Sequence, residues 1–234
     1  MGDLISLDAR RRERRSDADH GLAPQRQHKA TFYFDLADPG TYLAAERVDR
    51  LFPGVTWRPT SLEALQAGAA PPDPADAQRH FTERAEMLAM PLVWPDGDPK
   101  PVRAAMRTAA FAAEQGRGAE FVLAASRLAF CGGFDLNDPG VLAEAAAAAS
   151  IGLRECLHAA GDLSRDGAIE DGGRRLLAHG CDRLPAVRVG RVLFSGEGRI
   201  AEASAMRRDP VVPAAASGRE PLHRLVTRPR PTVA

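Results

Sequence analysis

The sequence has few of the residues that would assign it to several common protein classes. Its 234 residues include only three cysteines, Cys131, Cys156 and Cys181, and none of them belongs to a Cys-x-x-Cys pair. Such a scattered set is typical of buried free thiols in a reducing compartment. The 31 basic and 31 acidic side chains balance, so no overall field favours nucleic acid or an anionic membrane as a partner. The composition favours a small neutral ligand or a protein as the partner.

Long apolar segments are also missing. No stretch approaches the roughly 18 apolar residues that cross a bilayer, and the N-terminal segment lacks the apolar core of a signal peptide. We therefore expect no membrane partner and a cytoplasmic location. Residues 1–30 are polar and rich in arginine, and residues 208–234 are rich in proline and arginine. Both segments are expected to be disordered tails.

Between the tails, short runs of β-branched and aromatic residues predict four strands. The first two are TFYFDL at 31–36 and VTWRP at 55–59. Two alternating runs, PAVRV at 185–189 and RVLFS at 191–195, are joined through Gly190 and predict a β-hairpin near the end of the chain.

Helical signals fill the space between these strands. The proline of the second strand is followed by a largely helical segment at 61–160, which is interrupted by a Pro/Asp-rich loop at 71–76 and is expected to form an all-helical insertion. Residues 31–60 and 161–207 then form the sheet domain, with a closing helix within 196–207. The order predicts an α/β fold in which two early strands and a late hairpin share one sheet. The expected helices with the strongest signals run over about 101–115, 118–130, 139–149 and 165–179.

An Asp-Pro pair opens the first expected helix. Asp38 is a good helix cap and Pro39 suits the first helical turn. The chain repeats this motif, because FDLADPG at 34–40 is echoed by FDLNDPG at 134–140 in an ordinary helical context. Asp38 is therefore interpreted first as a cap and second as a functional residue.

Four segments carry a family resemblance. FYFDLADPGTYLA at 32–44 resembles the opening of the DsbA-like thioredoxin proteins, and particularly of 2-hydroxychromene-2-carboxylate isomerases and kappa-class glutathione transferases. The segments 90–107, 130–146 and 184–200 are similar to the same proteins. The resemblance implies a thioredoxin-like fold with a central four-stranded mixed sheet and an all-helical insertion. It also implies glutathione as a cofactor, a small hydrophobic substrate and a homodimer.

The reactive position of these relatives is altered. A DsbA oxidoreductase has cysteines at the places of Asp38 and Thr41, so their absence excludes dithiol exchange there. The isomerases and transferases place a serine at Asp38, and its hydroxyl donates a hydrogen bond to the glutathione sulfur. An ionised aspartate cannot donate and would repel a thiolate. The hydroxyl of Thr41 is the alternative donor, and Pro39 is placed beside the ligand.

The resemblance also implies a ligand groove. Pro185 is expected to be cis, so that the backbone of Leu184 pairs with an extended peptide-like ligand, although a rigid turn before a strand explains the same proline. Glu197 is a candidate for the glutathione ammonium group and Lys100 for a carboxylate, with solvated surface charges as the alternative. An apolar substrate would enter beside Trp94.

Two functions stay open on the sequence. One is a glutathione-dependent isomerase or transferase, and the other is a catalytically degenerate binding module with the thioredoxin fold. A redox role for Cys181 is a third hypothesis. No metal is predicted, because His80, His158 and His179 lack ligand-like spacing with any Cys, Asp or Glu cluster.

Overall fold

A four-stranded mixed sheet forms the centre of the protein. A computed structural model describes residues 29–68, 73–94 and 100–208. The tails expected at 1–30 and 208–234 therefore lie almost entirely outside the described residues. In the sheet order β2-β1-β3-β4, β1 runs parallel to β2 and antiparallel to β3, which pairs with β4 as a hairpin. This arrangement confirms the predicted sheet. The strands are β1 (Ala30–Phe34), β2 (Thr56–Pro59), β3 (Ala186–Val189) and β4 (Val192–Ser195).

The first strand is buried on both faces, which explains its apolar run. Phe32 and Phe34 point into the larger hydrophobic core, where Phe32 meets the indole of Trp57 edge-on with ring centroids 4.9 Å apart. Tyr33 points the other way, into a smaller core that includes Leu176. Because successive side chains of a strand alternate between its faces, one short segment anchors both layers of helices.

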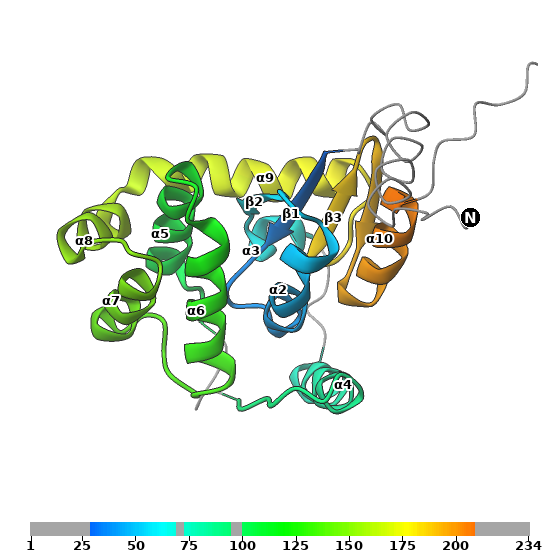
Figure 1. Cartoon of the computed structure of the whole chain (residues 1–234), viewed down its shortest axis with the longest axis horizontal. Coiled ribbons are helices and arrows are strands. Elements are labelled where there is room, and N and C mark those ends of the chain that lie inside the picture. The colour runs from blue at the N-terminus through cyan, green and yellow to red at the C-terminus, as the bar shows by residue number, and fades with distance from the viewer. Residues whose placement is uncertain (1–28, 69–72, 95–99, 209–234) are drawn as a thin grey trace, which may run out of the picture.

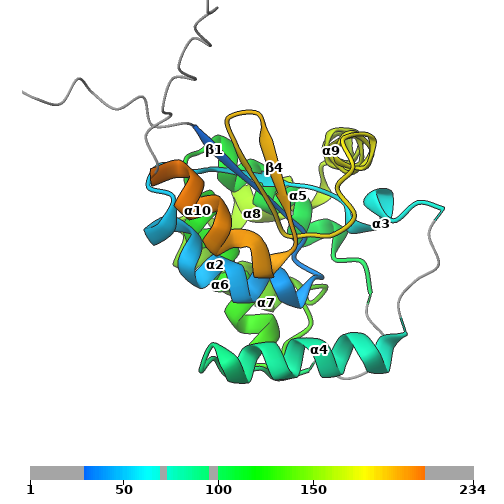
Figure 2. The ribbon, with the colours of Figure 1, turned by 90° about the vertical axis from the view of Figure 1, so that its right-hand side faces the viewer.

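Helices cover both faces of the sheet, and a further group of helices lies to one side of it. Figure 1 shows α5, α6, α7 and α8 grouped on one side of the sheet, with α10 on the other side. Figure 2 shows the sheet edge-on, with α2 and α10 on one face and α9 with α3 on the other. The larger core runs without a break from the sheet through α2 into α5 to α8. The helices are α2 (Pro39–Leu51), α3 (Leu62–Leu65), α4 (Pro74–Met87), α5 (Arg103–Glu114), α6 (Gly118–Phe130), α7 (Pro139–Ala148), α8 (Leu153–Gly161), α9 (Asp166–Ala178) and α10 (Ile200–Arg208).

One element begins where the sequence predicted a loop. Of the Pro/Asp-rich segment 71–76, residues 74–76 belong to α4. The Asp73 side chain accepts a hydrogen bond from the backbone N–H of Ala75 at 2.8 Å, and Pro74 occupies the first helical turn. The Asp-Pro signal that opens α2 and α7 therefore opens α4 as well. Figures 1 and 2 both show α4 as the lowest helix, set below α2.

None of the helices in the described ranges is long and apolar enough to cross a membrane.

Candidate ligand-binding site

The start of α2 is closed by its own cap. Asp38 Oδ1 accepts a hydrogen bond from the N–H of Gly40 at 3.1 Å, and Oδ2 accepts one from the N–H of Thr41 at 3.0 Å. These two N–H groups would otherwise have no partner within the helix. Asp38 is therefore the cap expected from the sequence, and the half-buried Pro39 follows it.

The Thr41 hydroxyl is part of the same network. It donates to Asp38 Oδ2 at 3.2 Å and accepts a hydrogen bond from the N–H of Asp35 at 3.3 Å. The side chain is fully buried. Thr41 thus positions Asp38, and its hydroxyl points into the protein rather than toward a groove.

Two buried carboxyl groups lie below this helix start. Burial raises the pKa of Asp38 to about 7, against the opposing effect of the N–H donors from Gly40 and Thr41, and the nearby Asp35 raises it further. Burial also raises the pKa of Asp35, although its carboxylate accepts hydrogen bonds from the N–H groups of Ala37 and Leu62. A carboxyl group with a pKa near 7 can accept and return a proton at neutral pH.

Gly40 is the point at which the helix start meets the proline loop. The Leu184–Pro185 bond is cis, as expected. A Cβ atom placed on Gly40 would lie 3.0 Å from Pro185 Cδ and 3.1 Å from Asp38 Oδ2. Asp38 and Pro185, which are far apart in the sequence, therefore pack closely against the same side of Gly40.

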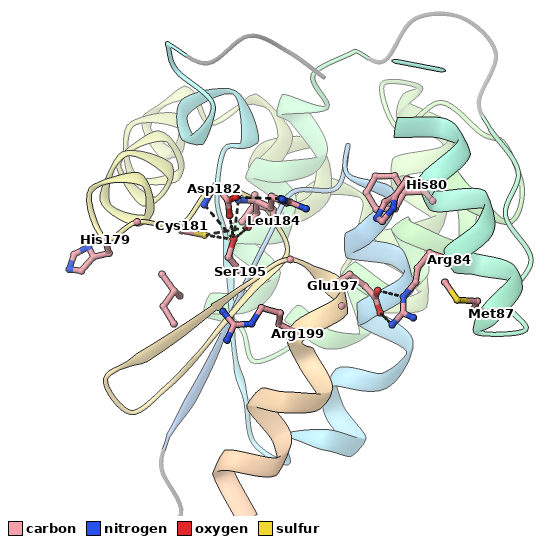
Figure 3. A pocket seen from close by; sticks show the side chains of 16 residues that line it. His80, Arg84, Met87, His179, Cys181, Asp182, Leu184, Ser195, Glu197 and Arg199 are labelled. Atoms are coloured by element: carbon pink, nitrogen blue, oxygen red, sulfur yellow. Dashed lines mark hydrogen bonds and ion pairs between the residues drawn. The ribbon is translucent and has the colours of Figure 1, made fainter. Parts of the chain in front are cut away.

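A groove of about 760 Å³ lies beside the proline loop. Figure 3 shows its two walls, with His80, Arg84 and Met87 of α4 on one side and the segment from Cys181 to Leu184 on the other. Charged and apolar side chains share the lining. Leu184 is buried, yet its backbone N–H and C=O have no hydrogen-bond partner among the residues that the structure describes. Such groups are available to an extended ligand in the groove.

Glu197 is buried and paired, in contrast to a solvated surface charge. Its side chain keeps only 5% of its surface exposed, and it pairs with Arg84 of α4 at 2.5 Å and with Arg47 of α2. Figure 3 shows the contact with Arg84 at the side of the groove. The carboxylate thus links two helices to the turn that follows β4.

The other two ligand candidates lie apart from this point. The Trp94 indole N–H donates to the hydroxyl of Thr82 on α4 at 3.2 Å, and neither Trp94 nor the exposed Lys100 lines the groove. The candidates at the start of α2 and at Pro185 therefore come together, Glu197 lines the groove paired with Arg84, and Trp94 forms a hydrogen bond with Thr82 of α4.

The cysteines form no redox pair. All three are free, and the buried Cys181 thiol donates to the carbonyl of Arg183 at 3.3 Å beside the groove. No group of His, Cys, Asp and Glu that could hold a metal ion occurs in the described part of the chain.

Two residues of this site, Phe81 and Arg84, were not predicted from the sequence. Both belong to α4 and face α2 and the β4 turn. The available signal was the Asp73-Pro74 helix start, after which Phe81, Arg84, Ala85 and Leu88 have the spacing of one helical face.

Solved structures identify the architecture. The chain is similar to a 2-hydroxychromene-2-carboxylate isomerase, with a TM-score of 0.63 and 16% identity over 76% of this chain and 94% of that one. A protein described as a probable DsbA oxidoreductase from Streptomyces coelicolor has a TM-score of 0.60 and 20% identity, covering 86% of this chain and all of that one. The fold is that of the DsbA-like thioredoxin proteins. A protein disulfide isomerase candidate from Nitrosomonas europaea adds a TM-score of 0.55 at 15% identity, over 77% of this chain and all of that one.

The DsbA-like fold confirms the fold predicted from the sequence, and at these identities the likeness extends to the fold alone. No family model and no curated protein matches the chain.

Proposed function

We propose that this DsbA-like protein binds glutathione along Leu184 and uses its thiol on a small hydrophobic substrate, as an isomerase or a transferase. The observation that supports this most strongly is the packing of Asp38 Oδ2 and Pro185 Cδ against Gly40, which brings the buried carboxyl group next to the cis-proline loop. The sulfur would lie beside Asp38 Oδ2 where the helix start borders the proline loop, and the free backbone groups of Leu184 would bind the peptide part of the ligand.

Asp38 supplies the proton acceptor in this proposal. The S–H bond of the ligand breaks, the proton binds to Asp38, and the electron pair remains on sulfur. The pKa of about 7 supports this step, because the carboxyl group can hold the proton at neutral pH. The protonated carboxyl group then donates a hydrogen bond to the thiolate, which removes the repulsion expected from an ionised aspartate. The positive end of α2 adds to the stabilisation of the thiolate.

The thiolate would then form a bond to an electrophilic carbon of the substrate. In a transferase, a leaving group departs with its electron pair. In an isomerase, the carbon–sulfur bond would form as a conjugated C=C bond opens and its electron pair moves onto the carbonyl oxygen of the substrate. After rotation about the resulting single bond, the electron pair returns, the C=C bond forms again, the carbon–sulfur bond breaks, and Asp38 returns the proton to the thiolate. Thr41 acts as a positioning residue, because its hydroxyl holds Asp38 Oδ2.

Glutathione titration tests the proposal. Calorimetry of the full chain is expected to detect binding of glutathione and of S-methylglutathione, which has no thiol proton. In Asp38→Ala, binding is expected to persist, while the rate of thiol addition to a chlorodinitrobenzene falls about 100-fold through loss of the general base. Asp138→Ala is the matched control, because Asp138 caps α7 in the same Asp-Pro-Gly motif and is exposed. Absence of any glutathione binding would overturn the proposal.

A non-catalytic binding module is the second candidate. It is favoured by the commitment of both Asp38 oxygens to the cap of α2 and by the complete burial of Thr41. For a binding module, calorimetry would detect the ligand, whereas thiol addition would proceed at the rate of free glutathione in the wild type and in Asp38→Ala alike.

A further inference from the structure

An aromatic ring packs against Gly40 beside Asp38 and Pro185. Phe81 Cε1 of α4 lies 3.1 Å from the Cβ position of Gly40, as close as Asp38 Oδ2 and almost as close as Pro185 Cδ. Three groups from α2, α4 and the proline loop therefore meet at one point. A ligand atom can reach Asp38 from this side only if the ring of Phe81 moves.

The helix that carries Phe81 has few attachments to the rest of the protein. Among the other helices, α4 packs chiefly against α2. Ala85 is its one buried residue, and Arg79 and Met87 are largely exposed. Phe81 and Ala85 lie one turn apart, so a single narrow stripe of α4 contacts the protein.

An ion pair between Arg84 and Glu197 holds this face of α4 against the protein. Arg84 donates from Nε to Glu197 Oε2 at 2.5 Å and from Nη2 to Oε1 at 3.2 Å. Glu197 is itself fixed from the opposite side by Arg47 of α2. Because Arg84 follows Phe81 by three residues, it sits on the same side of α4 and fixes the rotation that turns the ring toward Gly40.

We infer that α4 is a lid over the ligand site, in which Phe81 covers the Asp38 carboxyl group at Gly40 and Arg84 is the positioning residue that keeps the ring there. Opening separates Arg84 from Glu197 and withdraws the ring from Asp38 and Pro185. The identity of the ligand rests on the proposed function, whereas the inference that α4 is a lid does not depend on it. The lid makes ligand binding dependent on the Arg84–Glu197 contact.

The alkylation rate of a cysteine introduced under the lid measures how often the lid opens, and no ligand is needed. In an Asp38→Cys variant of the full chain, the rate of iodoacetamide alkylation at position 38 is followed by peptide mass spectrometry, which separates it from the three native cysteines. Alkylation is expected to be slow and to become about tenfold faster when Arg84→Ala is added, because an ion pair to a buried carboxylate is lost. Removal of a positive charge does not make a thiol more reactive, so a faster rate reports easier access to position 38.

Matched controls lie on the same helix. Arg79→Ala removes an arginine whose partner, Asp76, also belongs to α4, and it should leave the rate unchanged. Phe81→Ala should accelerate alkylation as Arg84→Ala does, while removal of the exposed Met87 side chain should not. Arg84→Lys, which keeps the charge, should restore part of the protection. Equal rates in the Arg84→Ala and Arg79→Ala backgrounds would overturn the lid.

Amide hydrogen exchange provides a test that does not require Asp38→Cys to fold. In the otherwise unchanged protein, Arg84→Ala should increase exchange over 74–87 and leave 30–34 of β1 protected. A uniform increase in both segments, or no increase over 74–87, would contradict the proposal. Neither experiment contains glutathione. A protein that fails to bind glutathione but shows these changes would retain the lid and lose the proposed function.

Discussion

Gly173→Ala is expected to lower the free energy of unfolding by about 3 kcal/mol, since it forces extra volume into a closely packed contact. Gly173 lies where α9 crosses α3. A Cβ atom there would approach the carbonyl oxygen of Ser61 to 2.5 Å and the backbone nitrogen of Leu65 to 3.0 Å. Both contacts are with backbone, so no side chain can turn away. The helices must separate instead.

The same helix contains the control for this prediction. Gly167 of α9 has no atom within 4 Å of its Cβ position, so Gly167→Ala is expected to raise the free energy of unfolding by up to about 1 kcal/mol through helix propensity. Urea unfolding of the two variants measures the contrast. Similar effects in both would show that the α3–α9 contact can relax. Because α9 leads directly to Cys181 and the groove, Gly173→Ala should also disturb the ligand site.

Asp38→Asn is expected to remove a pH dependence of stability. In the wild type, the carboxyl group keeps its proton up to a pKa of about 7 in the folded protein, compared with 3.8 for an unperturbed aspartate. The folded state therefore binds more protons than the unfolded state between these values, and stability falls as pH rises. The contribution has a slope on the order of 1 kcal/mol per pH unit. Above about pH 7, the full cost of a buried negative charge is present.

Urea unfolding of the wild type and Asp38→Asn from about pH 4 to about pH 8 tests this result. The stability of the variant relative to the wild type should rise across this range and then level off. Asp35 contributes with the same sign and remains in both proteins. Asp138→Asn, at the exposed copy of the motif, should follow the wild-type curve. Parallel curves for the wild type and Asp38→Asn would show that the Asp38 carboxyl is ionised throughout.

Much of the fold could be predicted, because many of its elements depend on short sequence segments. The apolar run of β1, the Asp38 cap and the hairpin around Gly190 each depend on residues close together in the sequence. Their order then restricts the sheet to few topologies. The start of α4 also had a local signal, but the proline-rich composition of 71–76 favoured a loop.

The candidate site was less predictable, because its chemistry depends on contacts between distant segments. Asp38 and Asp138 lie in local sequences that differ at one position and have the same capping role, yet of the two only Asp38 is buried. No local pattern distinguishes them. The pairing of Arg84 with Glu197 joins residues 113 positions apart, and the hydroxyl of Thr41 turned out to be enclosed by Asp35 and Asp38.

The two tryptophans lie in different surroundings, and the hydrogen bond between Trp94 and Thr82 makes one of them a fluorescent reporter for α4. The chain has two tryptophans, and Trp57 is enclosed by the phenylalanines of β1, while Trp94 is joined to the outer side of α4. Intrinsic fluorescence should therefore have two components. Quenching of the Trp94 component by acrylamide follows the movement of α4, and the Trp57 component changes only when the sheet itself comes apart.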